Sequence, residues 1–362
     1  MRAKKEKVVS RKLVVAIAII ALVALAGFVF FFNSNGGNSS GEDIAIIGGQ
    51  RIAGEIDKTF DEREIKTDND GTKFIVEPSK IRSGGPPKGG IGVDRGIPAL
   101  AEDNIKFVSV SDADKWIDDN ELVLVLVWKG VKRVYPLQIL VFHELANDVV
   151  AGDELLITYC PLCGSGIAYE RAVVVDEERK VTRFGTSGKL FNSNLVMYDE
   201  ETDTYWQQID GLAIVGELTG QELKEIAIDT VVWRDWKSAH PDSEVLSQDT
   251  GFNRNYGRDP YGNYYEDSFL FFPVENKDNR IHAKTPIVGI DIDGTFKAYR
   301  KEDVKKAGVI EDIVNGANIK VEQISDGRIV ITNTDTGDEI VKEEDFWFAW
   351  FAFHPETELY NG

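Results

Sequence analysis

The clearest chemical signal in the chain lies in residues 160–164, Cys-Pro-Leu-Cys-Gly, which hold both cysteines of the 362-residue sequence. Two thiols three positions apart can bind one metal ion through both sulfurs, or they can form a disulfide with each other. In thioredoxin-like sites the CxxC motif opens a helix, whose N-terminus lowers a thiol pKa. Here a Gly-Ser-Gly run and then a strand-like segment follow, so we expect a turn between two strands.

This turn resembles the metal-binding knuckle of rubredoxins and zinc ribbons, in which Pro and Gly let backbone N–H groups face the sulfurs. The usual second CxxC pair is absent, so the remaining ligands must come from elsewhere in the chain. His143, which precedes Cys160 across a predicted helix, a short turn and a returning strand, is the first candidate, and His354 and His282 come next. Two thiolates with one or two imidazoles would suit zinc, copper or iron.

Two other interpretations of the cysteine pair stay open. The pair fits a dithiol–disulfide couple that exchanges electrons with a redox partner. It also fits an inert disulfide, although so small a ring removes only about 2 kcal/mol of unfolded-state entropy. With an inert disulfide, the chain would be a non-catalytic module that binds a saccharide or a protein through aromatic side chains and its acidic surface.

The elements that must position these residues are mostly β-strands. Segments 121–128, 154–159 and 167–175 are rich in branched or alternating apolar residues, and the last two flank the cysteines. Helices are expected at three places, 111–119, 136–148 and 301–308, and the second of them would carry His143. The aromatic run 346–355 predicts a buried central strand. The fold class is therefore mainly β, with antiparallel sheets in a sandwich- or barrel-like arrangement and a few short helices.

An internal duplication is visible when the chain is aligned with itself so that Gly130 meets Gly294. Segments 126–159 and 290–323 then match without a gap, and their identical pairs also include Tyr135/Tyr299, Asp148/Asp312 and Gly152/Gly316. We expect two equivalent β-turn-β-helix-β units, because one copy is too small to bury its apolar faces alone. The second copy lacks the chemistry of the first, since Ala307 replaces His143 and Ile324 replaces Cys160.

A membrane anchor is predicted near the N-terminus. Residues 13–32 carry no charge and would span about 30 Å as a helix, which is the thickness of one bilayer core. Six Lys and Arg residues precede this run, so the positive-inside rule places the N-terminus in the cytoplasm and the rest of the chain outside. A cleaved signal peptide is the alternative, but the phenylalanine-rich segment 28–32 stands where small residues should precede cleavage.

The predicted organisation has four parts: a cytoplasmic basic segment (1–12), a transmembrane anchor (13–32), a linker with an irregular lead-in (33–93) and an extracytoplasmic domain (94–362). The formal net charge of −20 argues against nucleic acid as a partner, because phosphate binding needs a basic surface. The chain contains no P-loop, G-x-S-x-G or H-E-x-x-H motif. Its residue patterns therefore support a location and a chemical site but no particular reaction.

Several long motifs in the same order resemble the family catalogued as domain of unknown function 3179. They are VYPLQILVFHELAND, LLITYCPLCGSGIAYER, FGTSGKLFNSNLVMYDEETDTYWQQIDGLAIVG, VVWRDWKSAHPDSEVLS and FWFAWFAFHPETELY, and the resemblance runs from about residue 94 to the end. It implies an exported or membrane-tethered prokaryotic domain without an assigned reaction. It also gives weight to six residues of this chain, His143, Cys160, Cys163, Trp206, His240 and His354.

Overall fold

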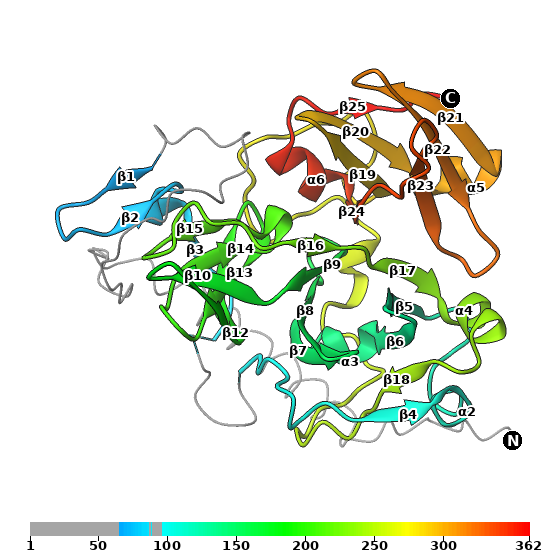
Figure 1. The fold of residues 1–362 in the computed structure, drawn as a ribbon, viewed down its shortest axis with the longest axis horizontal. Coiled ribbons are helices and arrows are strands. Elements are labelled where there is room, and N and C mark those ends of the chain that lie inside the picture. Colours follow the sequence, from blue (N-terminus) through cyan, green and yellow to red (C-terminus); the bar gives the residue numbers. More distant parts are fainter. Residues whose placement is uncertain (1–64, 87, 89–95) are drawn as a thin grey trace, which may run out of the picture. The chain divides into compact units, whose positions relative to one another are not determined.

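The computed structural model describes residues 65–86, 88 and 96–362 (Figure 1). The predicted cytoplasmic segment, the anchor and most of the linker lie outside these residues. Within the described part, no helix is both long and apolar enough to cross a membrane. The described residues are mainly β, with antiparallel pairing between most neighbouring strands and a few short helices, as the strand patterns predict.

Two sheets make up the first copy of the repeat. One has the strand order β17-β5-β6-β18-β4 and the other has the order β16-β9-β8-β7. Their strands are β4 (Phe107–Ser109), β5 (Leu122–Trp128), β6 (Val131–Pro136), β7 (Leu145–Val150), β8 (Asp153–Cys160), β9 (Ser165–Glu170), β16 (Glu225–Ile226), β17 (Asp229–Val232) and β18 (Glu244–Leu246). The helices of this copy are α2 (Val110–Ala113), α3 (Leu137–Leu140) and α4 (Trp233–Ala239).

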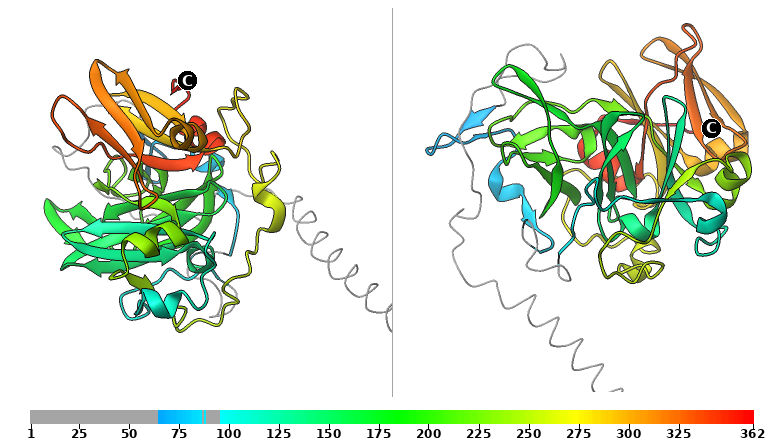
Figure 2. Two further views of the ribbon diagram at one scale, coloured as in Figure 1. Left: turned by 90° about the vertical axis from the view of Figure 1, so that its right-hand side faces the viewer. Right: turned by 60° about the horizontal axis from the view of Figure 1, so that its bottom comes forward.

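The second copy repeats this arrangement with the orders β24-β19-β20-β25 and β21-β22-β23. Its strands are β19 (Pro286–Ile292), β20 (Thr295–Arg300), β21 (Val309–Val314), β22 (Ala317–Gln323), β23 (Ile329–Asn333), β24 (Glu343–Phe346) and β25 (Glu358–Leu359), and its helices are α5 (Lys301–Ala307) and α6 (Trp347–Phe353). In both views of Figure 2 its yellow-to-red strands gather on one side of the cyan-to-green first copy.

The duplication predicted from the self-alignment is confirmed. Strands β5, β6, β7 and β8 correspond to β19, β20, β21 and β22. In each copy, the turn of the first hairpin and the turn of the second hairpin both contain a non-glycine residue followed by a glycine, and both residues have positive φ. Tyr135 donates a hydrogen bond to Asp148 at 2.7 Å, and Tyr299 donates to Asp312 at 2.9 Å. The same polar contact thus recurs at the same place in each copy.

The repeat also continues beyond the predicted segment, through a second match in a different register. The unit β17-α4-β18 corresponds to β24-α6-β25, and each unit borders the first hairpin of its own copy with the same pairing. Trp236 and Trp350 donate to Ser243 and Thr357 at 3.0 and 2.9 Å. Residues 347–353 form a helix, so the strand predicted from the aromatic run is wrong. The prediction failed because periodicity cannot distinguish a short, fully apolar strand from a helix.

The difference between the two registers comes from an insertion in the first copy, between β9 and β17. It forms a seven-stranded sheet with strands from the lead-in, in the order β1-β2-β15-β14-β13-β12-β3, and a separate hairpin. The strands are β1 (Lys66–Thr67), β2 (Lys73–Phe74), β3 (Arg82–Ser83), β10 (Ala172–Val175), β11 (Glu178–Val181), β12 (Phe184–Phe191), β13 (Asn194–Asp199), β14 (Tyr205–Gln207) and β15 (Ala213–Val215), and the single-turn 3₁₀ helices are η2 (Pro78–Lys80) and η3 (Ile209–Gly211). A third 3₁₀ helix, η4 (Gly262–Tyr265), lies between β18 and β19.

The helix predicted over 136–148 is wrong beyond its first turn. Only α3 is helical, and β7 begins at Leu145 and pairs with β8. Glu144, at a φ of 59°, reverses the chain between them, so strand pairing overrides the helical pattern. The helix predicted over 111–119 is also shorter and earlier, because Ser109 caps α2 by accepting a hydrogen bond from Asp112 N. The helix predicted over 301–308 is confirmed as α5, and Gly308 forms its C-cap.

The duplicated Tyr–Asp contact gives a matched pair of stability predictions. Tyr135→Phe should destabilise the fold by about 2 kcal/mol, because it leaves the buried Asp148 carboxyl without its side-chain donor. Tyr299→Phe should cost under about 1 kcal/mol, because Asp312 keeps an ion pair with Lys297 at 2.8 Å. Urea unfolding of the two variants tests this order, and equal losses would contradict it.

Candidate functional site

The two cysteines lie in the tight turn between β8 and β9, as the Cys-Pro-Leu-Cys-Gly pattern predicts. Their sulfurs are 3.0 Å apart, both thiols are free, and both side chains are buried. Cys163 N donates to Cys160 O at 3.1 Å and closes the turn. Gly164 follows at a φ of 62°, and a Cβ there would come within 2.9 Å of the Phe346 ring, so the position requires glycine.

A buried polar network that the sequence analysis missed surrounds the thiols. Ser193 O accepts from Cys163 Sγ at 3.3 Å, and Asn194 Nδ2 approaches the same sulfur at 3.6 Å. Asn194 also donates to Gln208 at 2.7 Å, and Gln208 donates to Thr158 of β8 at 2.9 Å. The inserted sheet thus supplies the polar groups around the turn. No sequence pattern separates these amides from ordinary surface residues.

Burial raises the pKa of the Cys163 thiol well above its ordinary value, and the neighbouring Cys160 raises it further. The Asn194 amide opposes this shift, because an N–H that points at the sulfur favours the thiolate. At neutral pH the resting state of Cys163 is therefore the neutral thiol.

Three histidines are predicted as metal ligands together with the thiols. Of these, His143 is fully buried, and both of its ring nitrogens have hydrogen-bond partners. Its Nδ1 lies 2.8 Å from Pro98 O and its Nε2 lies 2.6 Å from Tyr256 Oη, so hydrogen bonds take both ring nitrogens. His282 is exposed, and its Nδ1 accepts from Lys284 N at 3.2 Å. His354 is buried at the end of α6.

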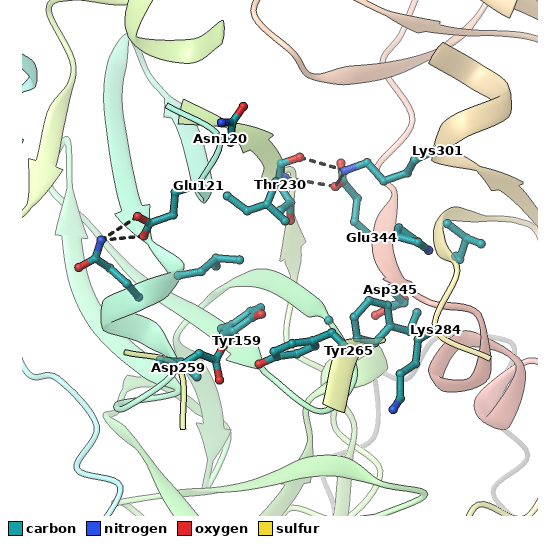
Figure 3. Close-up of a pocket in the computed structure, with 18 of the residues that line it drawn as sticks. Asn120, Glu121, Tyr159, Thr230, Asp259, Tyr265, Lys284, Lys301, Glu344 and Asp345 are labelled. Carbon is teal, nitrogen blue, oxygen red and sulfur yellow. Dashed lines mark hydrogen bonds and ion pairs between the residues drawn. The ribbon is translucent and has the colours of Figure 1, made fainter. Parts of the chain in front are cut away.

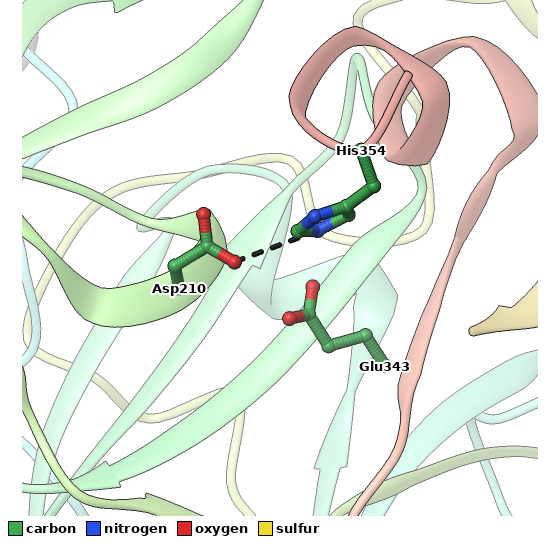
Figure 4. A group of neighbouring side chains, drawn as sticks. All are labelled: Asp210, Glu343 and His354. Carbon is green, nitrogen blue, oxygen red and sulfur yellow. Dashed lines mark ion pairs between the residues drawn. The ribbon is translucent and has the colours of Figure 1, made fainter. Parts of the chain in front are cut away.

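The described residues contain one group of three or more His, Cys, Asp or Glu ligand atoms within 4.8 Å of one another, and it includes neither cysteine. It consists of Asp210, Glu343 and His354 (Figure 4). Among the residues that the structure describes, no third such ligand atom therefore lies within 4.8 Å of both sulfurs. His354 belongs to a carboxylate-rich group, whereas the sequence analysis placed it with the thiols.

Strand β24 and the residue before it carry four consecutive charged side chains, Lys342 to Asp345, and all four are buried. Successive side chains of a strand point to opposite faces, and the two faces differ here. On one face Glu344 pairs with Lys342 at 2.8 Å and with Lys301, and these cations outweigh burial and lower its pKa to about 2. On the other face burial raises the pKa values of Glu343 and Asp345, and the nearby Asp210 carboxylate raises both further.

A cavity of about 810 Å³ lies between the two copies (Figure 3). Tyr159 and Gly164, which flank the cysteine turn, form part of its wall. Tyr265 and Phe346 add aromatic surface, and Glu121, Asp259 and Asn120 are among its polar residues. The cavity therefore extends to the residues beside the thiols.

Glu144 is a further residue that the sequence analysis missed. It is buried at a φ of 59°, where the second copy has Gly308 at 74°. Burial raises the pKa of its carboxyl to about 8. A buried acid in a conformation that favours glycine is strained, and such strain is concentrated at functional sites. The peptide O of Glu144 accepts from Tyr159 N at 2.7 Å, which connects it to the cysteine strand.

The neutral state of His143 gives a pH prediction. Burial lowers its pKa from 6.5 to about 4, so between these values the unfolded chain binds a proton that the folded chain does not. Its contribution to stability is complete above pH 6.5 and is lost as the pH falls toward 4. The free energy of unfolding of the wild type, relative to His143→Gln, should fall by up to about 3 kcal/mol between pH 7 and pH 4. Urea titrations at several pH values measure the difference, and parallel pH profiles would contradict it.

Comparison with known proteins identifies a family. The model of a family described as a protein of unknown function, DUF3179, matches residues 94–339, which is more than half of the chain. No curated protein and no solved structure matches the sequence.

Proposed function

Because the chain belongs to the DUF3179 family, whose description names no reaction, we propose a function from the geometry: a dithiol–disulfide redox domain centred on Cys160 and Cys163. The observation that supports this proposal is the placement of two free, buried sulfurs 3.0 Å apart without a third His, Asp, Glu or Cys ligand atom beside them in the described chain. A metal knuckle would need at least one more such ligand.

The reaction is a thiol–disulfide exchange with a partner disulfide. The two thiols lose two electrons and two protons, an S–S bond forms between Cys160 and Cys163, and the partner disulfide becomes two thiols. Exchange proceeds through a thiolate, and burial holds Cys163 in the neutral form. The pair should therefore react slowly until a partner opens the wall at Tyr159 and Gly164.

Mass spectrometry after alkylation in denaturant tests the redox couple. The protein treated with excess oxidised glutathione should lose both alkylation sites and the mass of two hydrogen atoms, and reduction should restore them. Cys160→Ser and Cys163→Ser should each abolish this reversible change. Elemental analysis of protein purified without added metal is the companion measurement. Thiols that stay free under oxidant, or a metal that is lost in Cys160→Ser, would contradict the redox proposal.

The contact between Asn194 and Cys163 gives a sharper prediction with a matched control. Asn194→Ala removes the N–H that favours the thiolate, so the pH at which Cys163 is half alkylated should rise. Asn192→Ala is the control, because Asn192 is also buried but donates to Ala352 O. Both variants should lose stability, and only Asn194→Ala should shift the alkylation profile. An equal shift in both variants would assign the effect to packing.

A ligand-binding module is the second candidate, and the 810 Å³ cavity favours it. Tyr159, Tyr265 and Phe346 offer ring faces beside the carboxylates of Glu121 and Asp259, a combination that suits a saccharide or a short peptide. Tyr265→Ala should then abolish binding of soluble glycans or peptides and leave the thiol couple unchanged. This readout separates the two candidates.

We also propose that residues 13–32 anchor the domain in the cell membrane with the folded part outside. The charge pattern of residues 1–32 supports this placement. An oxidising exterior would supply the partner disulfide that the redox proposal requires. Protease added to intact cells should degrade the domain, and digestion that requires lysis would place the domain inside.

A further inference from the structure

A second polar centre, which includes neither cysteine, lies at the border between the inserted sheet and the second copy. It contains Asp210 from η3, Glu343 from β24 and His354 from the end of α6 (Figure 4). The three side chains point toward one another at a cavity of about 640 Å³. His354 Nε2 lies 3.5 Å from Asp210 Oδ1, which is close to the distance expected between two ligands about 2.1 Å from the same ion.

Two buried atoms of this centre have no hydrogen-bond partner. His354 is 5% exposed and Glu343 is 8% exposed, yet His354 Nε2 and Glu343 Oε2 make no hydrogen bond. A buried polar atom without a partner is unfavourable, so both atoms are open to a bound water or ion.

The internal repeat provides a direct comparison for His354. His240 occupies the equivalent position after α4, and each histidine packs on its own tryptophan with ring centroids 4.1 Å apart. His240 Nε2 has a partner, because Asp326 Oδ2 lies 2.9 Å away. The equivalent imidazole nitrogen is therefore hydrogen-bonded in the first copy and has no hydrogen-bond partner in the second.

Further acidic side chains gather around the centre. Glu225 and Asp291 line the same cavity as Asp210, Glu343 and His354. A divalent cation bound at this point would compensate the charge of carboxylates that lie close together.

We propose that Asp210, Glu343 and His354 bind a divalent first-row transition-metal ion. Two carboxylate oxygens and one imidazole suit Zn²⁺ or Mn²⁺, whereas Mg²⁺ and Ca²⁺ prefer oxygen ligands throughout. The cavity leaves room for a water or a substrate oxygen in the remaining positions, as in catalytic rather than closed structural sites. This site is separate from the thiols and does not depend on the redox proposal.

Titration of the chelator-treated, full-length protein with Zn²⁺, and separately with Mn²⁺, tests the site. We expect one ion per chain and a rise in melting temperature. Glu343→Gln and His354→Gln should each weaken binding at least tenfold.

His240→Gln is the matched control, since it removes the equivalent imidazole and should leave the bound ion in place. Cys160→Ser should also keep the ion, which separates this site from any metal on the thiols. A wild type that takes up neither Zn²⁺ nor Mn²⁺, or that binds them no more tightly than Glu343→Gln does, would overturn the proposal. The centre would then be a set of carboxyls that share protons.

Discussion

Burial of the four charged residues from Lys342 to Asp345 is the constraint on which the other features depend. Strand β24 has to pair with β19, and Phe346 N donates to Cys163 O at 2.7 Å, so this strand cannot move to the surface without releasing the cysteine turn. The fold neutralises one face of the strand with Lys301 and Lys342. On the other face burial raises the pKa values of Glu343 and Asp345.

The two copies of the repeat share a framework but carry different polar and thiol side chains. The second copy repeats the framework of the first, including the Tyr–Asp contact and the Trp–His pair, but Ile324 occupies the place of Cys160. The first copy carries the thiols and the insertion, which brings Asn194 to the sulfur and Asp210 to His354. Both centres therefore combine a duplicated framework with residues that only one insertion provides.

Most of the framework could be predicted from the sequence because glycine turns and strand periodicity are local signals. The self-alignment of the chain predicted the correspondence of β5–β8 with β19–β22, and the Cys-Pro-Leu-Cys-Gly pattern predicted the turn between two strands. The partners of the site residues could not be predicted. Asp210 reaches His354 from the insertion in the first copy, a contact without a local signal, and the helical course of 347–353 depends on its tertiary burial.

Each copy also places a loop into the other copy. The turn between β8 and β9 of the first copy bonds to Phe346 of the second, and the loop between β22 and β23 of the second copy presents Asp326 to His240 of the first. The two contacts come from equivalent turns of the repeat and run in opposite directions. Displacing either turn would therefore remove a hydrogen bond from both copies at once, so local opening at one turn would also affect the other copy.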